Sequence, residues 1–433
     1  MRLTRIFILS LVAVLVTISA QAQDGNASEM KNGSFYSFYG AGYPVNLSVG
    51  QERGMGILGV SLDNSQVSTL QNPAIWGRNA FTTATSGFDV NSYSATDLQT
   101  KSKNGTLEAS FLQLTLPISR EKLGLSASLY PVTRSNYRIL EEQTIYPGPS
   151  DTLTYTSDNQ GVGGINKLEF GLGWKINENI SVGYAPSFVF MTKIKAEEIY
   201  LGQSEFSSAN TRNEVRGTGI GHRFGVLLSQ NNFFRNRDRL SIGASLTLPV
   251  NFEVEESTKT DRFINGEPQE VQIGDTQVGN LNLPLEINTG LTYYPSNLVN
   301  VSLEGQMQKW SEFEYELNSA TEQVMSDRYQ LGLGGQYHAY RLGSDRFLSQ
   351  FRYSAGLTYD TGHLTLSDQD IQTLWLSAGI GIISPQRSQS TVDISFRYGF
   401  RGTTTNNLVK EEIWAINFSV NLAELMFFKR RLR

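Results

Sequence analysis

The sequence predicts an all-β fold, a transmembrane antiparallel β-barrel of about fourteen strands. Three observations support this prediction: an N-terminal export signal, long stretches in which apolar and polar residues alternate, and connections that alternate between long and short. After residue 20 no apolar run approaches the roughly 18 residues that a membrane-spanning helix needs. A barrel needs no such run, because only every second residue of each strand faces lipid.

Residues 1–22 form a predicted secretory signal peptide. The start is basic, residues 6–18 are mostly apolar, and Ala20-Gln21-Ala22 matches the small-residue cleavage site. We expect cleavage after Ala22, so that the mature chain begins outside the cytoplasm. An exported chain with 40 Gly, 19 Tyr and no Cys favours the outer membrane of a Gram-negative bacterium.

From about residue 80 onward the chain alternates with a period of two, which is typical of strands with one apolar face. In the segment 414–422, for example, Trp, Ile, Phe, Val and Leu fall on one face, and Ala, Asn and Ser fall on the other. A tilted strand needs about ten residues to span a bilayer. Strands of this length are expected near 80–91, 106–118, 122–134, 162–176, 179–192, 217–230, 238–253, 281–294, 298–311, 326–340, 347–360, 370–383, 390–402 and 411–423.

Three of these strands have features of their own. The second changes face between Ser110 and Leu112, and Pro131 interrupts the third. In the seventh, the apolar face is expected to run from Leu240 through Leu248 to Val250.

The connections alternate between long polar loops and short turns. The long loops are expected at 135–161, 193–216 and 254–280, and turns such as 119–121 and 177–178 separate the other strands. An outer-membrane barrel has short periplasmic turns and long extracellular loops, whereas a soluble β-sandwich has no reason to keep its long loops at one end. The loop order therefore favours the barrel, with both chain ends in the periplasm.

Eight glycines fall on the polar side of the predicted strands, which faces the lumen. Such small inward residues leave room for something inside the barrel or let the strands curve, and the sequence does not decide between these roles. The glycines are Gly171, Gly173, Gly183, Gly243, Gly334, Gly356, Gly379 and Gly381.

Residues 23–79 precede the first predicted strand and do not alternate. Gly54, Gly56 and Gly59 give a formal G-x-G-x-x-G match, but the strand before it and the helix after it that a dinucleotide site needs are missing. Asp63-Asn64 and Asn72-Pro73-Ala74 follow. This arrangement resembles the hatch of the FadL-like outer-membrane transport proteins, in which a Gly-rich stretch, an acidic or amide pair and Asn-Pro-Ala lead into the first strand.

Further motifs continue the resemblance in the same order to the C-terminus. They are Gly163-Gly164-Ile165-Asn166, Leu283-Pro284-Leu285, Trp310-Ser311-Glu312-Phe313 and a closing segment from Asn421 to Arg430 that is similar to variants from the Bacteroidota. The resemblance implies a signal peptide at 1–22, an extension and lumenal hatch or plug at 23–79, and a fourteen-stranded barrel at 80–433. It implies hatch or gating roles for Asn72, Pro73, Ala74, Gly54, Gly56, Gly59 and Asp63.

Charged residues on the polar faces are candidates for lining the lumen, where they can form ion pairs with neighbouring strands or with the hatch. They are Glu169, Arg223, Glu286, Glu304, Arg352, Asp393 and Arg397. His222, His338 and His363 are scattered and have no paired serine motif, so we expect no catalytic residues and no enzyme activity. We expect no metal and no cofactor, and the net charge of −5 argues against a nucleic-acid partner.

Two functions follow from the sequence and the resemblance. The first is an outer-membrane channel for passive uptake of hydrophobic or amphipathic small molecules, similar to long-chain fatty acids, through a hatch-gated barrel. The predicted loop at 193–216 is polar, which argues against long-chain fatty acids as the specific ligand. The alternative is a non-transporting barrel that acts as a scaffold or accessory subunit of an envelope or secretion complex. We expect a monomer in contact with outer-membrane lipid, and the alternative adds envelope protein partners.

Overall fold

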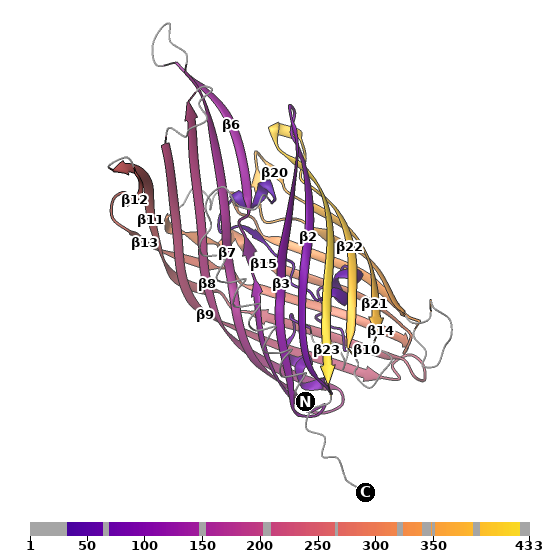
Figure 1. Cartoon of the computed structure of the whole chain (residues 1–433). Coiled ribbons are helices and arrows are strands. Elements are labelled where there is room, and N and C mark those ends of the chain that lie inside the picture. Colours follow the sequence, from indigo (N-terminus) through magenta and orange to yellow (C-terminus); the bar gives the residue numbers. More distant parts are fainter. Residues whose placement is uncertain are drawn as a thin grey trace.

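The computed structural model describes residues 33–63, 69–146, 153–201, 209–264, 267–317, 324–339, 348, 351–383 and 390–424. Over these residues the chain forms a closed antiparallel barrel of fourteen strands, which confirms the predicted fold class (Figure 1). The predicted signal peptide and the closing residues 425–433 lie outside the described residues. In the part of the chain that is described, no helix is long and apolar enough to cross a membrane.

The strands follow one another around the barrel in chain order, and four of them are interrupted and so consist of more than one element. The barrel closes where the last strand pairs with the first, from Thr82 opposite Glu424 to Thr96 opposite Lys410. In order, the elements are β2 (Thr82–Thr96), β3 (Lys101–Ser119), β4 (Leu123–Pro131), β6 (Tyr137–Ile145), β7 (Leu153–Lys175), β8 (Ile180–Leu201), β9 (Ala209–Asn231), β10 (Arg239–Thr247), β11 (Val250–Ile264), β12 (Glu267–Gln272), β13 (Gln277–Leu283), β14 (Glu286–Ser296), β15 (Val299–Gln308), β16 (Glu314–Tyr315), β17 (Arg328–His338), β18 (Phe351–Asp360), β21 (Thr373–Ile383), β22 (Thr391–Arg401) and β23 (Lys410–Glu424).

The outward face of the barrel is an apolar belt. On β23, Trp414, Phe418 and Leu422 are exposed, whereas Asn417 and Asn421 on the same strand are buried toward the lumen. Corresponding outward residues on β7 and β22 are exposed in the same way. Burying this belt in water-free lipid is favourable because every backbone group of a closed barrel is paired internally. The barrel therefore resides in a Gram-negative outer membrane.

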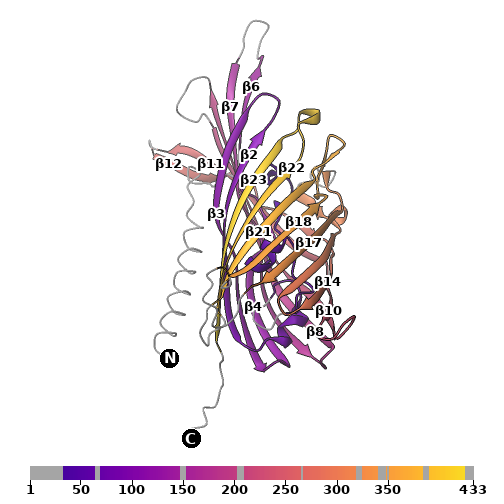
Figure 2. The same ribbon diagram turned by 90° about the vertical axis from the view of Figure 1, so that its right-hand side faces the viewer.

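The prediction of three long loops is wrong, because most of each predicted loop is strand. Strands β7, β8 and β9 contain 23, 22 and 23 residues, and β11 continues with β12 as a hairpin beyond the barrel. These extensions form one tall wall at the end of the barrel opposite the C-terminal end of β23 (Figure 2). Their apolar alternation is weak because both faces lie outside the membrane, so the sequence pattern resembles that of a loop.

Local irregularities decide the direction of several side chains. In β3, Phe111 lies opposite Gly87 and Ala109 lies opposite Phe88, so a bulge leaves Ser110 between them without a partner. This bulge produces the predicted change of face. Pro131 ends β4, as expected. The assignment of Val250 to the same face as Leu240 is wrong. The chain breaks at Leu248-Pro249 because proline has no N–H for the ladder, and Val250 then points inward, where it is 2% exposed.

Residues 33–63 and 69–79 lie inside the barrel, and we call them the inner segment. It contains η2 (Phe35–Phe38), β1 (Tyr43–Pro44), α2 (Gly50–Met55) and η3 (Pro73–Arg78). In Figure 1 its indigo and violet turns are enclosed by the strands. Its helix α2 contacts β17, β18, β21, β22 and β23, whereas η3 contacts β3, β4, β7, β8 and β9.

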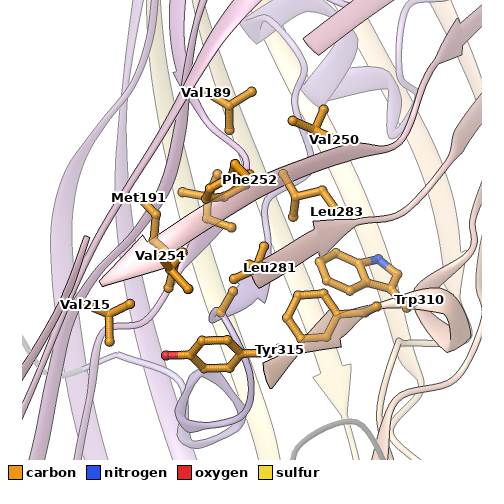
Figure 3. Packing of buried hydrophobic residues seen from close by; sticks show 13 residues of the cluster. Val189, Met191, Val215, Val250, Phe252, Val254, Leu281, Leu283, Trp310 and Tyr315 are labelled. Atoms are coloured by element: carbon orange, nitrogen blue, oxygen red, sulfur yellow. The ribbon is translucent and has the colours of Figure 1, made fainter. Parts of the chain in front are cut away.

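An apolar cluster fills the lumen beside the tall wall. Inward residues of β8, β9, β11 and β13 pack against Trp310 and Phe313 of the turn at η4 (Trp310–Glu312), and against Tyr315 (Figure 3). The cluster includes Val250 and Phe252 from the strand that follows the break at Pro249. This part of the lumen is thus packed with side chains from the barrel wall itself.

Candidate functional site

Each residue expected to belong to a hatch is buried inside the barrel. Asn72, Pro73 and Ala74 begin η3, Gly54 lies in α2, Gly56 ends α2, and Gly59 and Asp63 follow it. Together they sit at the contacts between the inner segment and both halves of the barrel wall.

Glu304 on β15 attaches the inner segment through consecutive backbone groups. Its Oε2 accepts hydrogen bonds from the N–H groups of Leu58 at 2.9 Å, Gly59 at 2.6 Å and Val60 at 3.2 Å. Its Oε1 accepts from the N–H of Ser61 at 2.9 Å and from the hydroxyl of Ser61 at 2.7 Å. The left-handed conformation of Gly59, with φ of 88°, helps these N–H groups converge. Glu304 is 1% exposed, so the hydrogen bonds are shielded from water.

Asn72 fixes the start of η3 and connects it to two other segments. Its side-chain oxygen accepts from the N–H of Ala74 at 3.0 Å, which is N-terminal capping. Its amide nitrogen donates to the carbonyl of Val60 at 2.8 Å and to that of Val226 on β9 at 3.0 Å. Pro73 follows at the first position of the turn, where its missing N–H costs nothing.

Inward glycines let the inner segment approach the wall at backbone distance. A Cβ at Gly334 or Gly356 would overlap the carbonyl oxygen of Met55, and one at Gly243 would overlap that of Val60. Seven of the eight predicted inward glycines meet the inner segment in this way, and Gly381 instead faces Asp393 and Arg352. Of the two roles that the sequence left open, the structure therefore favours room for a backbone inside the barrel.

Buried polar contacts fasten the inner segment at two further places. Within the segment Arg78 donates to Asp63 at 2.9 Å, and Ser229 of β9 donates to the same carboxylate at 2.9 Å. Arg53 of α2 pairs with Asp89 of β2. The sequence reasoning missed Arg53 and Asp89, although Asp89 interrupts a strand of small and apolar residues at an inward position.

The seven lumen-lining candidates all point inward, and most have a charged or polar partner. Arg223 lies 3.6 Å from Glu169 and donates to the hydroxyl of Tyr130 at 2.9 Å. Arg352 pairs with Asp393 at 2.5 Å. Glu286 accepts from Asn288 and Gln308 on the same inner face, and Glu304 holds the inner segment. Arg397 on β22 differs from the others, since it stacks on the ring of Trp375 with its guanidinium carbon 4.3 Å from the ring centre.

The extension before the predicted hatch is also attached to the wall, which the sequence did not reveal. The Ser34 hydroxyl donates to Glu411 on β23 at 2.8 Å, and Arg401 on β22 pairs with Glu411 at 3.2 Å. Asn46 accepts from Arg328, which forms an ion pair with Asp360 at 2.6 Å. The many aromatic residues near positions 35–43 were the only signal that this extension packs against the barrel.

The backbone ladder of the barrel is incomplete between β3 and β6. Strand β4 pairs with β3 only from Leu112 onward, and β6 pairs only with β7. Residues 101–111 and 137–145 therefore face each other without backbone pairing, and we call this opening the β3–β6 seam. Side chains bridge the seam at the end next to β4, where Glu108 forms an ion pair with Arg134 and accepts a hydrogen bond from Asn136 at 2.6 Å.

A polar cavity of about 120 Å³ lies behind the seam. Its walls come from the inner segment, from β2 and β3, and from β21 and β22. Four arginines line it, namely Arg53, Arg134, Arg397 and Arg401, together with three acidic residues, Asp89, Glu108 and Asp360. The lining is thus suited to charged or hydrogen-bonding groups.

The histidines do not assemble into a site. His222 on β9 lies 2.9 Å from the hydroxyl of Tyr184, His338 ends β17, and His363 is buried beside Tyr43 and Trp310. Among the residues that the structure describes, no group of His, Asp and Glu side chains could hold a metal ion.

Comparisons with known proteins agree with this architecture. A family model described as BamG matches residues 3–433. No curated protein matches the chain. Among solved structures, a FadL homologue from Pseudomonas aeruginosa is 13% identical with a TM-score of 0.59, covering 88% of this chain and 99% of that one. The toluene transporter TbuX from Ralstonia pickettii is 14% identical with a TM-score of 0.56 (87% and 98% covered). The CymD monoaromatic hydrocarbon channel is 15% identical with a TM-score of 0.53 (88% and 99% covered). At these identities the likeness establishes the fold.

Proposed function

We propose that this chain, which belongs to the BamG family, is an accessory subunit of an outer-membrane protein assembly, with its barrel closed by a hatch to which the inner segment belongs. The observation that carries the proposal is the tall wall of strands outside the membrane. The family name points to a Bam-related role, in agreement with a protein that works beside others.

The tall wall exceeds what membrane insertion requires. Strands β7, β8 and β9 are about twice as long as β18, β21 and β22, which contain 10, 11 and 11 residues. About ten residues suffice to cross the bilayer. The additional length forms a paired sheet with charged side chains such as Glu197, Glu214 and Arg216, and it gives a partner a rigid surface outside the cell.

The inside of the barrel supports a closed state. The hatch is attached at separate points by Glu304, by the ion pair of Arg53 with Asp89 and by the hydrogen bond from Ser229 to Asp63, and the cavity beside it is polar. Breaking one buried ion pair typically costs about 3–5 kcal/mol. Opening a continuous path would require several of these attachments to be lost together.

Shortening the β11–β12 hairpin is expected to remove partner binding and leave the barrel intact. Asp261 and Glu270 lie opposite each other in this hairpin. Deleting 262–264 and 267–269 would leave these two residues connected by Asn265-Gly266, a sequence that favours a two-residue hairpin turn. We expect at least a tenfold loss of co-purified partner protein after extraction from native membranes in mild detergent.

The shortened protein should keep its heat-modifiable migration in SDS gels, which reports a folded barrel. As a control, replacing only Glu267 by Ala retains the length of the hairpin and should retain the partner. If the intact protein elutes without a stoichiometric partner, the accessory role is wrong.

A second candidate function is a channel for hydrophobic small molecules, which the β3–β6 seam favours. An interruption of the wall offers a sideways route into the lumen, and the solved structures with this fold include a toluene transporter and a monoaromatic hydrocarbon channel. Long-chain fatty acids and gating by Asn72-Pro73-Ala74 remain part of this candidate.

Closing the seam tests the channel directly. The chain has no Cys, so Ala109→Cys with Arg134→Cys introduces a single pair of thiols at positions that the Arg134 side chain now connects by donating to the carbonyl of Ala109. A reducible bifunctional thiol reagent can bridge this gap. If the protein is a channel, uptake of labelled toluene or laurate by a host lacking its own transporter should fall at least fivefold on cross-linking and recover on reduction. Uptake that never exceeds the empty-vector level would contradict the channel and leave the accessory role standing.

A further inference from the structure

Arg397 is a charged side chain inside the barrel without a counterion. Within the described residues it forms no hydrogen bond and no ion pair, and its Nε is buried. Its only specific contact is the stack on Trp375, which is itself 7% exposed. Arg397 itself is partly buried, and a cation that is partly withdrawn from bulk water is stabilised by an anion at its guanidinium.

The neighbouring charges do not supply this anion. Arg53 is paired with Asp89 and Arg134 with Glu108, while Arg401 and Asp360 have partners just outside the cavity, Glu411 and Arg328. Each of these carboxylates already has its own arginine. One positive charge, that of Arg397, is therefore left over at the cavity.

An uncharged donor at the same cavity also lacks a partner. Tyr43 is one of the residues that line the cavity, and its hydroxyl is buried and makes no hydrogen bond among the described residues. The Arg401 guanidinium lies over the Tyr43 ring, 3.9 Å from its centre, and so fixes the ring in place. A buried hydroxyl without a partner costs about 1–3 kcal/mol, and a ligand oxygen at this position would relieve that cost.

The cavity and the β3–β6 seam share part of their lining. Thr106 and Glu108 of β3 and Arg134 and Asn136 near the start of β6 belong to both. These four residues are polar, which suits the passage of a hydrated, charged group. A ligand that passes between these side chains would reach the cavity without displacement of α2 or η3.

We propose that this cavity binds a small carboxylate, with Arg397 as its counterion and the Tyr43 hydroxyl as a second donor. A single negative charge matches the single unpaired cation, and a planar carboxylate fits a guanidinium edge. The volume of about 120 Å³ admits a group the size of acetate. This site goes beyond the accessory role and does not depend on it.

Binding is tested by saturation-transfer NMR on the full-length protein in a nonionic detergent, at constant pH and ionic strength, with chloride as the reference anion. We expect saturable binding of acetate to the unaltered protein and at least a tenfold weaker Kd for Arg397→Gln. Arg397→Lys keeps the charge and should stay within about threefold. The exposed and distant Arg216→Gln serves as the matched control and should bind acetate normally.

Two further measurements make the result decisive. Tyr43→Phe removes only a hydroxyl without a partner, so this variant should fold normally and bind acetate several-fold more weakly. It therefore tests the proposal if Arg397→Gln fails to fold. A comparison of octanoate with acetate shows which kind of molecule carries the bound carboxylate. Tighter binding of octanoate indicates an amphiphile, and equal binding indicates a free small acid. The proposal is overturned if acetate does not compete with chloride, if inorganic phosphate binds more tightly than acetate, or if Tyr43→Phe and a folded Arg397→Gln both bind like the unaltered protein.

Discussion

Replacement of Glu304 by Ala is expected to release residues 58–61 from the barrel wall while the barrel itself stays folded. The variant removes one carboxylate that accepts four backbone N–H groups and one hydroxyl. These donors would be left in a site that is closed to water, and the loss of a buried charged partner of this kind costs roughly 3–5 kcal/mol. This is the largest effect that we expect from a single side chain.

Hydrogen exchange followed by mass spectrometry measures this release. The amides of Leu58 to Ser61 should exchange roughly 150- to 5,000-fold faster in Glu304→Ala, the factor that corresponds to the expected cost. Glu304→Gln keeps the shape and one acceptor oxygen, so it should give an intermediate result. Glu314→Ala alters an exposed carboxylate on β16 and should leave these amides unchanged. Unaltered exchange at 58–61 in Glu304→Ala would refute the attachment.

Replacement of Gly334 by Val is expected to force α2 away from the wall. The added Cβ would overlap the carbonyl oxygen of Met55, which is backbone and cannot rotate aside as a side chain could. Overpacking a closed interior costs about 1–3 kcal/mol or more, and here Gly356 presses on the same oxygen from the next strand. We therefore expect a loss at the upper end of this range.

The adjacent glycine supplies the matched control. A Cβ at Gly335 would meet only the carbonyl oxygen of Asn300 at 3.6 Å, an ordinary contact. Gly335→Val should thus change the temperature of heat modification in SDS gels by a few degrees at most, whereas Gly334→Val should lower it clearly and speed amide exchange at residues 50–56. Equal behaviour of the two variants would mean that the approach of Met55 is not a tight one.

The sequence predicts the membrane-embedded part of this fold well, and the reason is physical. Lipid imposes one apolar face on every strand, so each of the fourteen spans near 80–423 carries its own signal. The extensions of β7, β8 and β9 carry no such signal because neither of their faces is in contact with lipid. Their sequence therefore predicts loops. The break at Pro249, after which Val250 points inward, leaves no signal because the apolar alternation continues across it.

The candidate site was predictable as a set of residues but not as a set of contacts. Glu304, Gly334 and Asn72 could be singled out as inward or hatch positions from the alternation and the resemblance. That Glu304 faces four successive N–H groups depends on the path of residues 58–61, which no local pattern encodes. The pairing of Arg53 with Asp89 likewise joins residues on different elements through the barrel interior.

The position of the inner segment at the very start of the chain constrains how the barrel can be made. Helix η3 contacts strands from the first half of the barrel, and α2 contacts strands from the second half. The pairing of β2 with β23 joins the first strand to the last one synthesised. The N-terminal residues must therefore already lie in the concave sheet when this last join forms, since a finished barrel offers no way to thread both elements in afterwards. The early strands packed on η3 would form the first half of the barrel, and β17 to β22 would then pack around α2 to complete it. Variants that weaken the contacts of the inner segment should therefore slow the closure of the barrel and also lower the stability of the folded protein.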